Sequence, residues 1–127
     1  MKRCFLFAIL LLALILGGGR VYAQSNLSQI KNELQVGNVS NLARSFASEI
    51  DLTLPSGSDT YGKAAAAQQL LNFFQSNTPQ SFTIKHNGTA PDGSTFMVGT
   101  MATSGGNYRT YLVFRQNAIQ ELSFEKQ

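Results

Sequence analysis

The spacing of apolar residues along the chain predicts helices first and strands afterwards. Helical spacing predicts a helix that begins after Asn26 and ends at Gly37, a short helix over residues 39–46, and a longer one over 63–77. Alternation of apolar and polar residues predicts a strand over residues 50–54 and four more over 81–86, 95–103, 107–115 and 118–125. The links between the last four strands are short, which favours antiparallel hairpins. The pattern therefore predicts one α+β domain.

The longest predicted helix changes in side-chain size along its length. Its apolar face is small near the start, at Ala66 and Ala67, and bulky near the end, at Phe73 and Phe74. Small residues let a sheet approach closely, whereas the two phenylalanines need a wider space. Gly99 lies inside a predicted strand, where glycine commonly marks a bulge or a bend. We therefore expect this helix to lie against a curved sheet.

The first residues have the layout of a secretory signal peptide. Lys2 and Arg3 precede an unbroken apolar run over residues 4–16, and Val21 and Ala23 are the small residues that a signal peptidase reads. The alternative is a membrane anchor, but a spanning helix needs about 20 apolar residues and this run is shorter. We expect a signal peptide over residues 1–23, a single domain over 24–127, and export to the periplasm or the medium.

Removing that leader changes the charge and the cysteine content. The 127-residue chain has a net charge of +3, but residues 24–127 carry seven basic and seven acidic side chains. A neutral domain gives no support for binding nucleic acid or, after cleavage, a membrane. Cys4 is the only cysteine and lies in the leader, so the exported part has no disulfide or thiolate metal site. The sequence indicates no cofactor.

Most of the exported part is similar to a known family. The stretches YGKAAAAQQLLNFFQSNTPQSFTIKHNG, DGSTFMVGTMATSGGNYRTYLVFRQ and IQELSFE resemble exported Bacteroidetes proteins labelled only as a domain of unknown function. That family lies in the nuclear-transport-factor-2-like superfamily, which also contains ketosteroid isomerases. The positions that match its pattern are Phe73, Phe74, His86, Gly88, Gly99, Tyr108 and Arg109.

The resemblance implies a fold but no reaction. It implies a cone in which three N-terminal helices meet a curved antiparallel sheet, and the sheet wraps around the long third helix. Gly62 departs from the family pattern, because relatives often have a serine there that caps this helix. Asp59 or Thr60 is then expected to act as the cap.

Two carboxylates, Glu49 and Asp51, flank Ile50 at the start of the first predicted strand. Residues two apart on a strand point to the same face. Catalysis of glycosidic cleavage requires carboxylates on opposite sides of the bond, so this pair is better explained as the solvated face of the strand. Ile50, Leu52 and Leu54 then point into the core.

His86 and Tyr61 are the candidates for chemistry inside the cone. The alternation Phe82, Ile84, His86 places the imidazole at the end of the apolar face of its strand. A histidine there could act as a general base, or it is a structural residue bonded to a backbone carbonyl. Tyr61 could donate its hydroxyl to a ligand, or it packs against the start of the helix. No second histidine is present for a metal site.

Arg109 is a third ligand-binding candidate, on the opposite face of the sheet. Arg109 and Arg115 flank Tyr111 and Val113 on one face of the strand over residues 107–115. Met97 and Met101 of the preceding strand would join this face if the register allowed it. Such a partly apolar outer face suits a homodimer, and the alternative is an ordinary surface with long side chains lying over it.

The sequence thus favours a binding module over an enzyme. We expect an exported domain that binds a small molecule or a protein without catalysis. The alternative is a small cofactor-free enzyme, resembling an isomerase or dehydratase, with His86 as its base. A catalytic site requires His86 and a second polar group inside an open cavity, whereas a core filled by Phe73, Phe74 and their neighbours contradicts it.

Overall fold

The computed structural model describes residues 27–127. The predicted signal peptide, its cleavage site and the Asn26 cap lie outside these residues. Residues 27–36 are helical, and Gly37 then adopts a φ of +69°. The Gly37 N–H donates to the carbonyl of Leu34 at 3.2 Å, which closes the last turn. Gly37 ends this helix, as predicted.

Residues 32–127 form one compact unit, and the remaining description concerns it. Its elements are α2 (Val39–Arg44), β1 (Phe46–Leu54), β2 (Gly57–Gly62), α3 (Lys63–Ser76), β3 (Pro79–Thr89), β4 (Thr95–Thr103), β5 (Gly106–Arg115) and β6 (Ala118–Lys126). The predicted long helix and the last four strands are confirmed to within a few residues.

Two predicted elements differ from the structure near the start of this unit. The short helix ends at Arg44, and Phe46 already belongs to β1, where it pairs with Ile119 of β6. Strand β2 was not predicted, because its sequence GSDTYG has no apolar alternation. It pairs with β1 alone and lies at the edge of the sheet. Its side chains are mostly exposed, so the strand does not require alternating apolar residues.

The start of α3 also differs from the expectation. Gly62 is its N-cap residue, and no side chain caps the helix there. Asp59 and Thr60 lie within β2 instead, so the prediction that one of them caps α3 is wrong. Thr60 donates its hydroxyl to Asp51 on the neighbouring strand, and this cross-strand bond removes it from the helix end.

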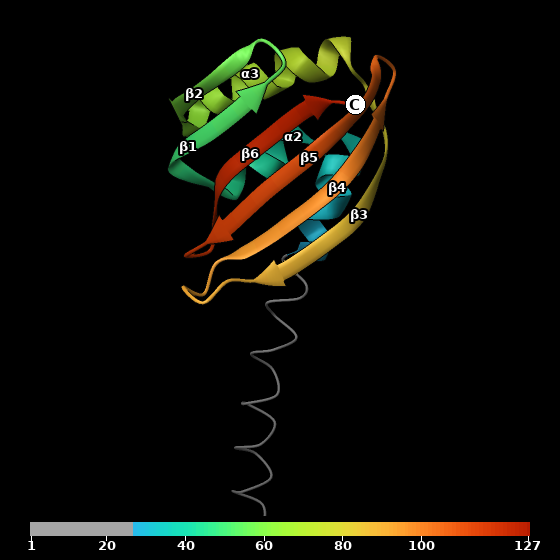
Figure 1. The fold of residues 1–127 in the computed structure, drawn as a ribbon. Coiled ribbons are helices and arrows are strands. Elements are labelled where there is room, and N and C mark those ends of the chain that lie inside the picture. The colour runs from blue at the N-terminus through green and yellow to red at the C-terminus, as the bar shows by residue number, and fades with distance from the viewer. Residues whose placement is uncertain (1–26) are drawn as a thin grey trace, which may run out of the picture. The chain divides into compact units, whose positions relative to one another are not determined.

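The six strands form one mixed sheet in the order β2-β1-β6-β5-β4-β3 (Figure 1). Four of the pairs are antiparallel hairpins between consecutive strands. The fifth pair, β1 with β6, is parallel, so the prediction of an antiparallel sheet is wrong at that position. Short links determine the direction of consecutive strands only, and β1 and β6 are joined by all the elements between them.

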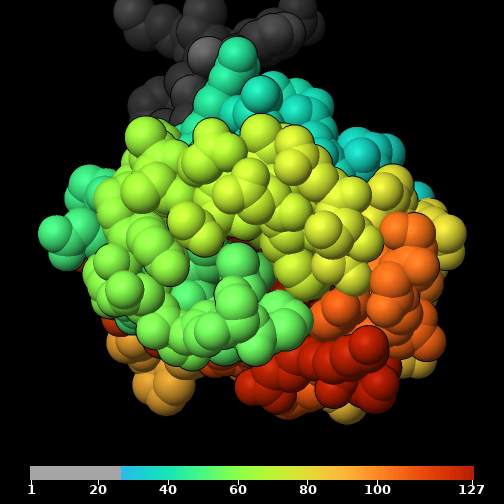
Figure 2. All heavy atoms as spheres, turned by 90° about the horizontal axis from the view of Figure 1, so that it is seen from above, coloured from blue at the N-terminus to red at the C-terminus, as the bar shows by residue number. Residues whose placement is uncertain are grey.

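Helices α2 and α3 lie on the same side of this sheet (Figure 1). Figure 2 shows α3, in yellow-green, lying against the green β1–β2 hairpin. Alternate residues of the central strands point to this side, and most of them are buried, for example Ile50 and Leu52 in β1, Leu112 in β5 and Leu122 in β6. We call this the inner face of the sheet and the opposite side the outer face.

Candidate functional site

Aromatic rings fill the space between the C-terminal half of α3 and the inner face of the sheet. The ring of Phe73 lies 5.1 Å from Tyr108 of β5 and 5.2 Å from Phe124 of β6, measured between centroids. Phe74 lies 5.8 Å from Phe124. All four side chains are at most 9% exposed. We call these four residues the aromatic cluster. It occupies the position where an inward-facing catalytic cavity would have to open.

A hydrogen bond ties the aromatic cluster to the end of α3. The Tyr108 hydroxyl donates to Oδ1 of Asn77 at 2.8 Å. The Asn77 side-chain amide in turn donates to the carbonyl of Phe73 at 3.2 Å, in the last turn of the helix. Because Tyr108 is buried, its hydroxyl needs such a partner. Its role in the structure is therefore to hold the helix end against β5.

Replacing Tyr108 with phenylalanine is expected to lower the free energy of unfolding by about 1 kcal/mol, the usual net contribution of one hydrogen bond. Urea denaturation followed by circular dichroism measures this loss. Tyr111→Phe is the matched control, since Tyr111 has no hydrogen bond within the described residues and is expected to leave stability unchanged. Equal losses in both variants would contradict a role for the Asn77 bond.

His86 does not point into the core. Ile84 pairs with Gly99, but His86 pairs with Val98, so the register of β3 shifts by one residue between them. Such a bulge turns the following side chains to the other face of the sheet. His86 is exposed on the outer face, and the prediction that it continues the apolar face of Phe82 and Ile84 is wrong.

The other two candidates lie on opposite faces of the sheet. Tyr61 is half-buried in β2 opposite Ile50, on the inner face. Arg109 is exposed on the outer face, and the predicted alternation of Arg109, Tyr111, Val113 and Arg115 on that face is confirmed by their burial. The structure therefore places His86 and Arg109 on one face and separates both from Tyr61.

Register also decides which apolar residues reach the outer face. Met97 pairs with Leu112 and Met101 with Tyr108, and both methionines are buried in the core. The prediction that they add to the outer face is therefore wrong. Phe96 and Val98 lie there instead, half-buried, beside Val113 and Tyr111 respectively.

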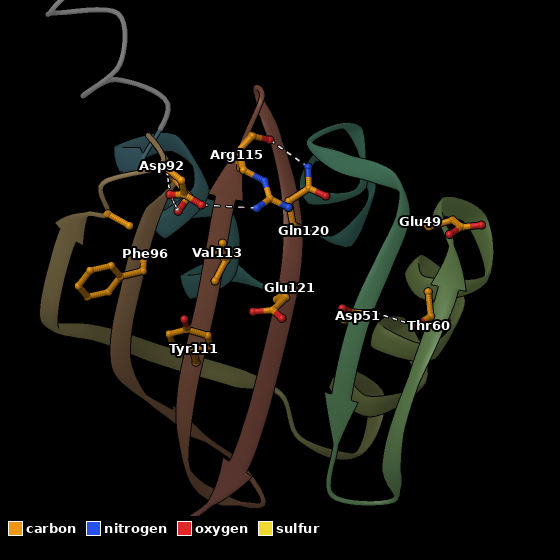
Figure 3. Close-up of a pocket in the computed structure, with 12 residues that line it drawn as sticks. Glu49, Asp51, Thr60, Asp92, Phe96, Tyr111, Val113, Arg115, Gln120 and Glu121 are labelled. Atoms are coloured by element: carbon orange, nitrogen blue, oxygen red, sulfur yellow. Dashed lines mark hydrogen bonds and ion pairs between the residues drawn. The ribbon is translucent and has the colours of Figure 1, made fainter.

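A groove of about 420 Å³ crosses this outer face (Figure 3). One cross-strand row of paired residues runs along it, from Thr60 in β2 through Asp51 in β1, Glu121 in β6 and Val113 in β5 to Phe96 in β4. The other lining residues are Glu49, Ala90, Asp92, Ser94, Tyr111, Arg115 and Gln120. We call this feature the outer groove.

The side of the outer groove formed by β4 and β5 is apolar. Phe96 and Val113 face each other across the two strands, with Tyr111 next to them. A Cβ at Gly88 of β3 would lie 3.0 Å from Cζ of the Phe96 ring, so the ring covers the backbone of the edge strand there. This contact explains why residue 88 is a glycine, because a side chain there would push against the Phe96 ring. It also keeps Phe96 at the end of the groove.

A single ion pair closes one corner of the outer groove. Nη1 of Arg115 lies 3.6 Å from Oδ2 of Asp92, in the loop between β3 and β4. The hydroxyl and the backbone N–H of Ser94 both donate to Oδ1 of Asp92. These hydrogen bonds, with Arg115, hold the pKa of Asp92 below its ordinary value. The charge of Arg115 is thus already matched by a carboxylate.

The side of the outer groove formed by β1 and β6 is acidic. Asp51 and Glu121 are direct partners in the parallel pair, so their side chains lie next to each other on the same face. Asp51 accepts the Thr60 hydroxyl at 2.6 Å. Within the described residues neither Glu121 nor Glu49 has a hydrogen bond or a basic partner. Both Glu49 and Asp51 are exposed on one face, as predicted.

The outer groove combines residues that sequence reasoning missed, above all Phe96, Asp92 and Glu121. The alternation in each strand indicates which residues face outward, but only the register shows that Glu121 adjoins Asp51 and that Phe96 adjoins Val113. The loop residue Asp92 is harder to recognise as part of a site, because an Asp-Gly pair in a hairpin loop is already explained by the turn itself.

Two smaller pockets lie on the helical side of the molecule. One, of about 350 Å³, runs between the start of α2 and α3, and includes Val39 and Leu71. The other, of about 300 Å³, lies between the β1–β2 turn and the end of α3, and reaches Phe73 and Tyr108. None of the three pockets is lined by His86, Tyr61 or Arg109.

Residues 27–127 offer neither a metal site nor a membrane-spanning helix. This part of the chain contains no group of three or more histidine, cysteine or acidic side chains arranged to hold a metal ion. None of the helices in the same residues is long and apolar enough to cross a bilayer.

Solved structures of two Bacteroides proteins are similar to this chain. The DUF4783 family protein from Bacteroides uniformis is 27% identical, with a TM-score of 0.72, and the match covers 77% of this chain and 94% of that one. The DUF4783 family protein from Bacteroides fragilis is 29% identical, with a TM-score of 0.71, and the match covers 77% and 95%.

A more distant structure extends the likeness in fold alone. An NTF2-like protein of unknown function from Cytophaga hutchinsonii is 8% identical, with a TM-score of 0.60 over 82% of this chain and 88% of that one. No protein with curated annotation is significantly similar in sequence. The family model described as a domain of unknown function, DUF4783, matches residues 27–125. The chain therefore belongs to the DUF4783 family and has the α+β fold of NTF2-like proteins.

Proposed function

We propose that this protein is an exported, non-catalytic binding module, and that its binding surface is the outer groove. The observation that carries the proposal is the contrast between the two faces of the sheet. On the inner face the aromatic cluster fills the space beside α3. On the outer face a groove of about 420 Å³ combines half-buried apolar residues with carboxylates, and such polar groups beside an apolar surface can fix the orientation of a ligand.

The fold and the location complete this proposal. We propose that the sheet curves around α3 as in the cone of the superfamily, which the packing of Phe73 against both Tyr108 and Phe124 supports. Export to the periplasm or the medium is supported by the leader-like pattern of residues 1–23.

Catalysis with His86 as the base is the less favoured alternative. A general base must lie within about 3 Å of the proton that it removes, and a second group must hold the substrate. His86 lies at the edge strand and does not line the outer groove. Its neighbour in the next strand is Val98, which has no polar group to offer.

A ligand screen by two-dimensional NMR tests the proposal. The isotope-labelled protein is titrated with fragments that are cationic, anionic or neutral. We expect hits to shift the amide signals of β4, β5 and β6 around Val113. Val113→Trp fills the groove with a bulky side chain and is expected to abolish these shifts.

Ala102→Trp is the matched control, since Ala102 lies on the outer face of β4 but outside the groove. It is expected to leave the shifts intact. Hits that shift Phe73 and Tyr108 instead, or that are insensitive to Val113→Trp, would contradict binding in the outer groove. Loss of hits in a His86→Ala variant would favour the enzymatic alternative.

A further inference from the structure

We infer that the outer groove binds an extended peptide segment of a partner protein, with basic side chains toward one end of the segment and apolar side chains toward the other. This inference rests on the proposed function and specifies the chemistry of the partner. It depends on three features of the groove, namely its length, its division into an acidic and an apolar side, and the excess of carboxylates on the outer face.

The length of the outer groove suits an extended chain. It reaches from Thr60 in β2 to Phe96 in β4 and so crosses five neighbouring strands. Since neighbouring strands lie about 4.8 Å apart, these residues are separated by roughly 19 Å. An extended peptide rises about 3.3 Å per residue, so about six residues span this distance, with every second side chain directed at the sheet. The open floor of the groove lies along the sheet (Figure 3), which favours a peptide over a small molecule that must be enclosed.

The two sides of the outer groove require different side chains of this peptide. On the acidic side, Asp51 and Glu121 are cross-strand partners that present two carboxylates on one face, where a cationic side chain offsets the repulsion between like charges. A lysine or arginine side chain supplies that cation. On the apolar side, Phe96 and Val113 stay half-buried and can be covered by an aliphatic or aromatic side chain. The adjacent Tyr111 ring adds a further surface for either group.

Arg115, the basic residue that lines the groove, does not form an ion pair with Asp51 or Glu121. Arg115 is held by Asp92 at the corner of the groove. Among residues 27–127, no other lysine or arginine lines it. A positive charge beside Asp51 and Glu121 can therefore be supplied by the partner.

The charge of the outer face also argues against a second copy of the chain as the occupant. The outward positions of β1, β5 and β6 carry four carboxylates and two guanidinium groups; the carboxylates are those of Glu49, Asp51, Glu121 and Glu125, and the guanidinium groups are those of Arg109 and Arg115. Two such faces brought together can pair only some of their carboxylates with guanidinium groups, and the remaining excess of negative charge disfavours association. The same excess of negative charge attracts a basic partner.

Fluorescence anisotropy with defined peptides tests the inference on the full chain, expressed with residues 1–23 in place. The probe is a fluorescein-labelled heptapeptide with Lys at positions 1 and 3, Leu at 5, Phe at 7 and Ser between them. A second peptide has Glu in place of both Lys. We expect saturable binding of the first peptide, weaker binding at higher salt, and no binding of the second.

Glu121→Gln and Glu125→Gln form a matched pair of variants, because both residues face outward on β6 and only Glu121 lines the groove. We expect Glu121→Gln to weaken binding of the lysine peptide by about tenfold, the loss of one charge-assisted contact. Glu125→Gln is expected to change it less than about twofold, since exposed charges outside a contact contribute little. Unfolding curves of both variants show whether the fold is intact.

Several outcomes overturn the inference. Equal binding of the glutamate peptide, equal effects of the two variants, or no binding of the lysine peptide each contradict a cation-specific groove. Concentration-dependent dimerisation that masks Val113 would identify a second copy as the occupant instead. If the lysine peptide fails while NMR fragments still bind at Val113, the proposed function stands and only the peptide inference falls. If both fail, the outer groove is not the binding surface.

Discussion

Replacing Phe124 with alanine is expected to lower the free energy of unfolding by about 3–5 kcal/mol, the usual cost of removing a buried aromatic ring. Phe124 is fully buried, and its ring packs on both Phe73 and Phe74 of α3. Its removal therefore leaves a cavity between the helix and the centre of the sheet. Urea denaturation of wild type and variant measures the difference, and the slope of the transition checks that the unfolding mechanism is unchanged.

Phe96→Ala is the control for this prediction. Phe96 is a phenylalanine of the same sheet, but it is half-buried on the outer face. Its removal is expected to cost about 1–2 kcal/mol, because part of the ring stays exposed to water and so contributes less to stability than a fully buried ring. An equal loss in both variants would mean that the aromatic cluster is not the main support of the core. A loss of ligand binding in Phe96→Ala without a large loss of stability would agree with the proposed function.

Gly99→Ala is expected to have the second largest effect, a loss of about 3 kcal/mol, at the upper end of the usual cost of overpacking. A Cβ at this position would collide with the backbone carbonyl of Thr83 and would lie 2.9 Å from Cζ of the Phe82 ring. The carbonyl belongs to the neighbouring strand and cannot rotate away. The variant must therefore displace β3 from β4, and thermal unfolding should show a clear fall in melting temperature.

Gly62→Ala is the matched control for this substitution. At Gly62 the nearest atom to an added Cβ is the carbonyl oxygen of Ser48, at 4.0 Å, which is an ordinary contact. Gly62 is the N-cap of α3 and has an extended backbone, so alanine is expected to cost about 1 kcal/mol, the usual disadvantage of alanine at an N-cap, and clearly less than Gly99→Ala. If Gly99→Ala is as harmless as Gly62→Ala, β3 and β4 can separate locally and the sheet is less rigid than its register indicates.

The local elements of this fold are largely predictable from the sequence. The face of α3 formed by Ala66, Leu70, Phe73 and Phe74 is buried as its spacing predicts. The tight turn between β5 and β6 is equally clear, and Gln116 and Asn117 adopt the positive φ values that such a turn requires. Helical spacing, strand alternation and short turns all act within about ten residues, and a single sequence records them directly.

The pairing of distant strands is not recorded in the same way. The parallel contact between β1 and β6 depends on how the whole chain between them folds. The bulge after Ile84 is another example, because one extra residue reverses the face of His86 without changing the composition of the strand. Gly99, the partner of Ile84, indicates an irregularity in the sheet at this position, but it does not show that the extra residue lies in β3.

The outer groove is harder to predict from the sequence than the pairing of the strands. Its two sides lie on strands that are neighbours only in the folded state, so the approach of Asp51 to Glu121 has no local signature. Sequence reasoning correctly explained Glu49 and Asp51 as solvent-facing residues. It searched for a site on the inner face, where the resemblance to isomerases pointed, and the aromatic cluster occupies that space.

The position of β6 has a consequence for the order of folding. This strand comes last among the six strands of the sheet, yet it lies between β1 and β5 and joins the β1–β2 hairpin to the remaining strands. A ribosome-bound chain that ends before residue 118 lacks the only strand that connects these two parts of the sheet. Sheet closure must therefore wait until residues 118–126 have been synthesised, which delays native structure in the nascent polypeptide.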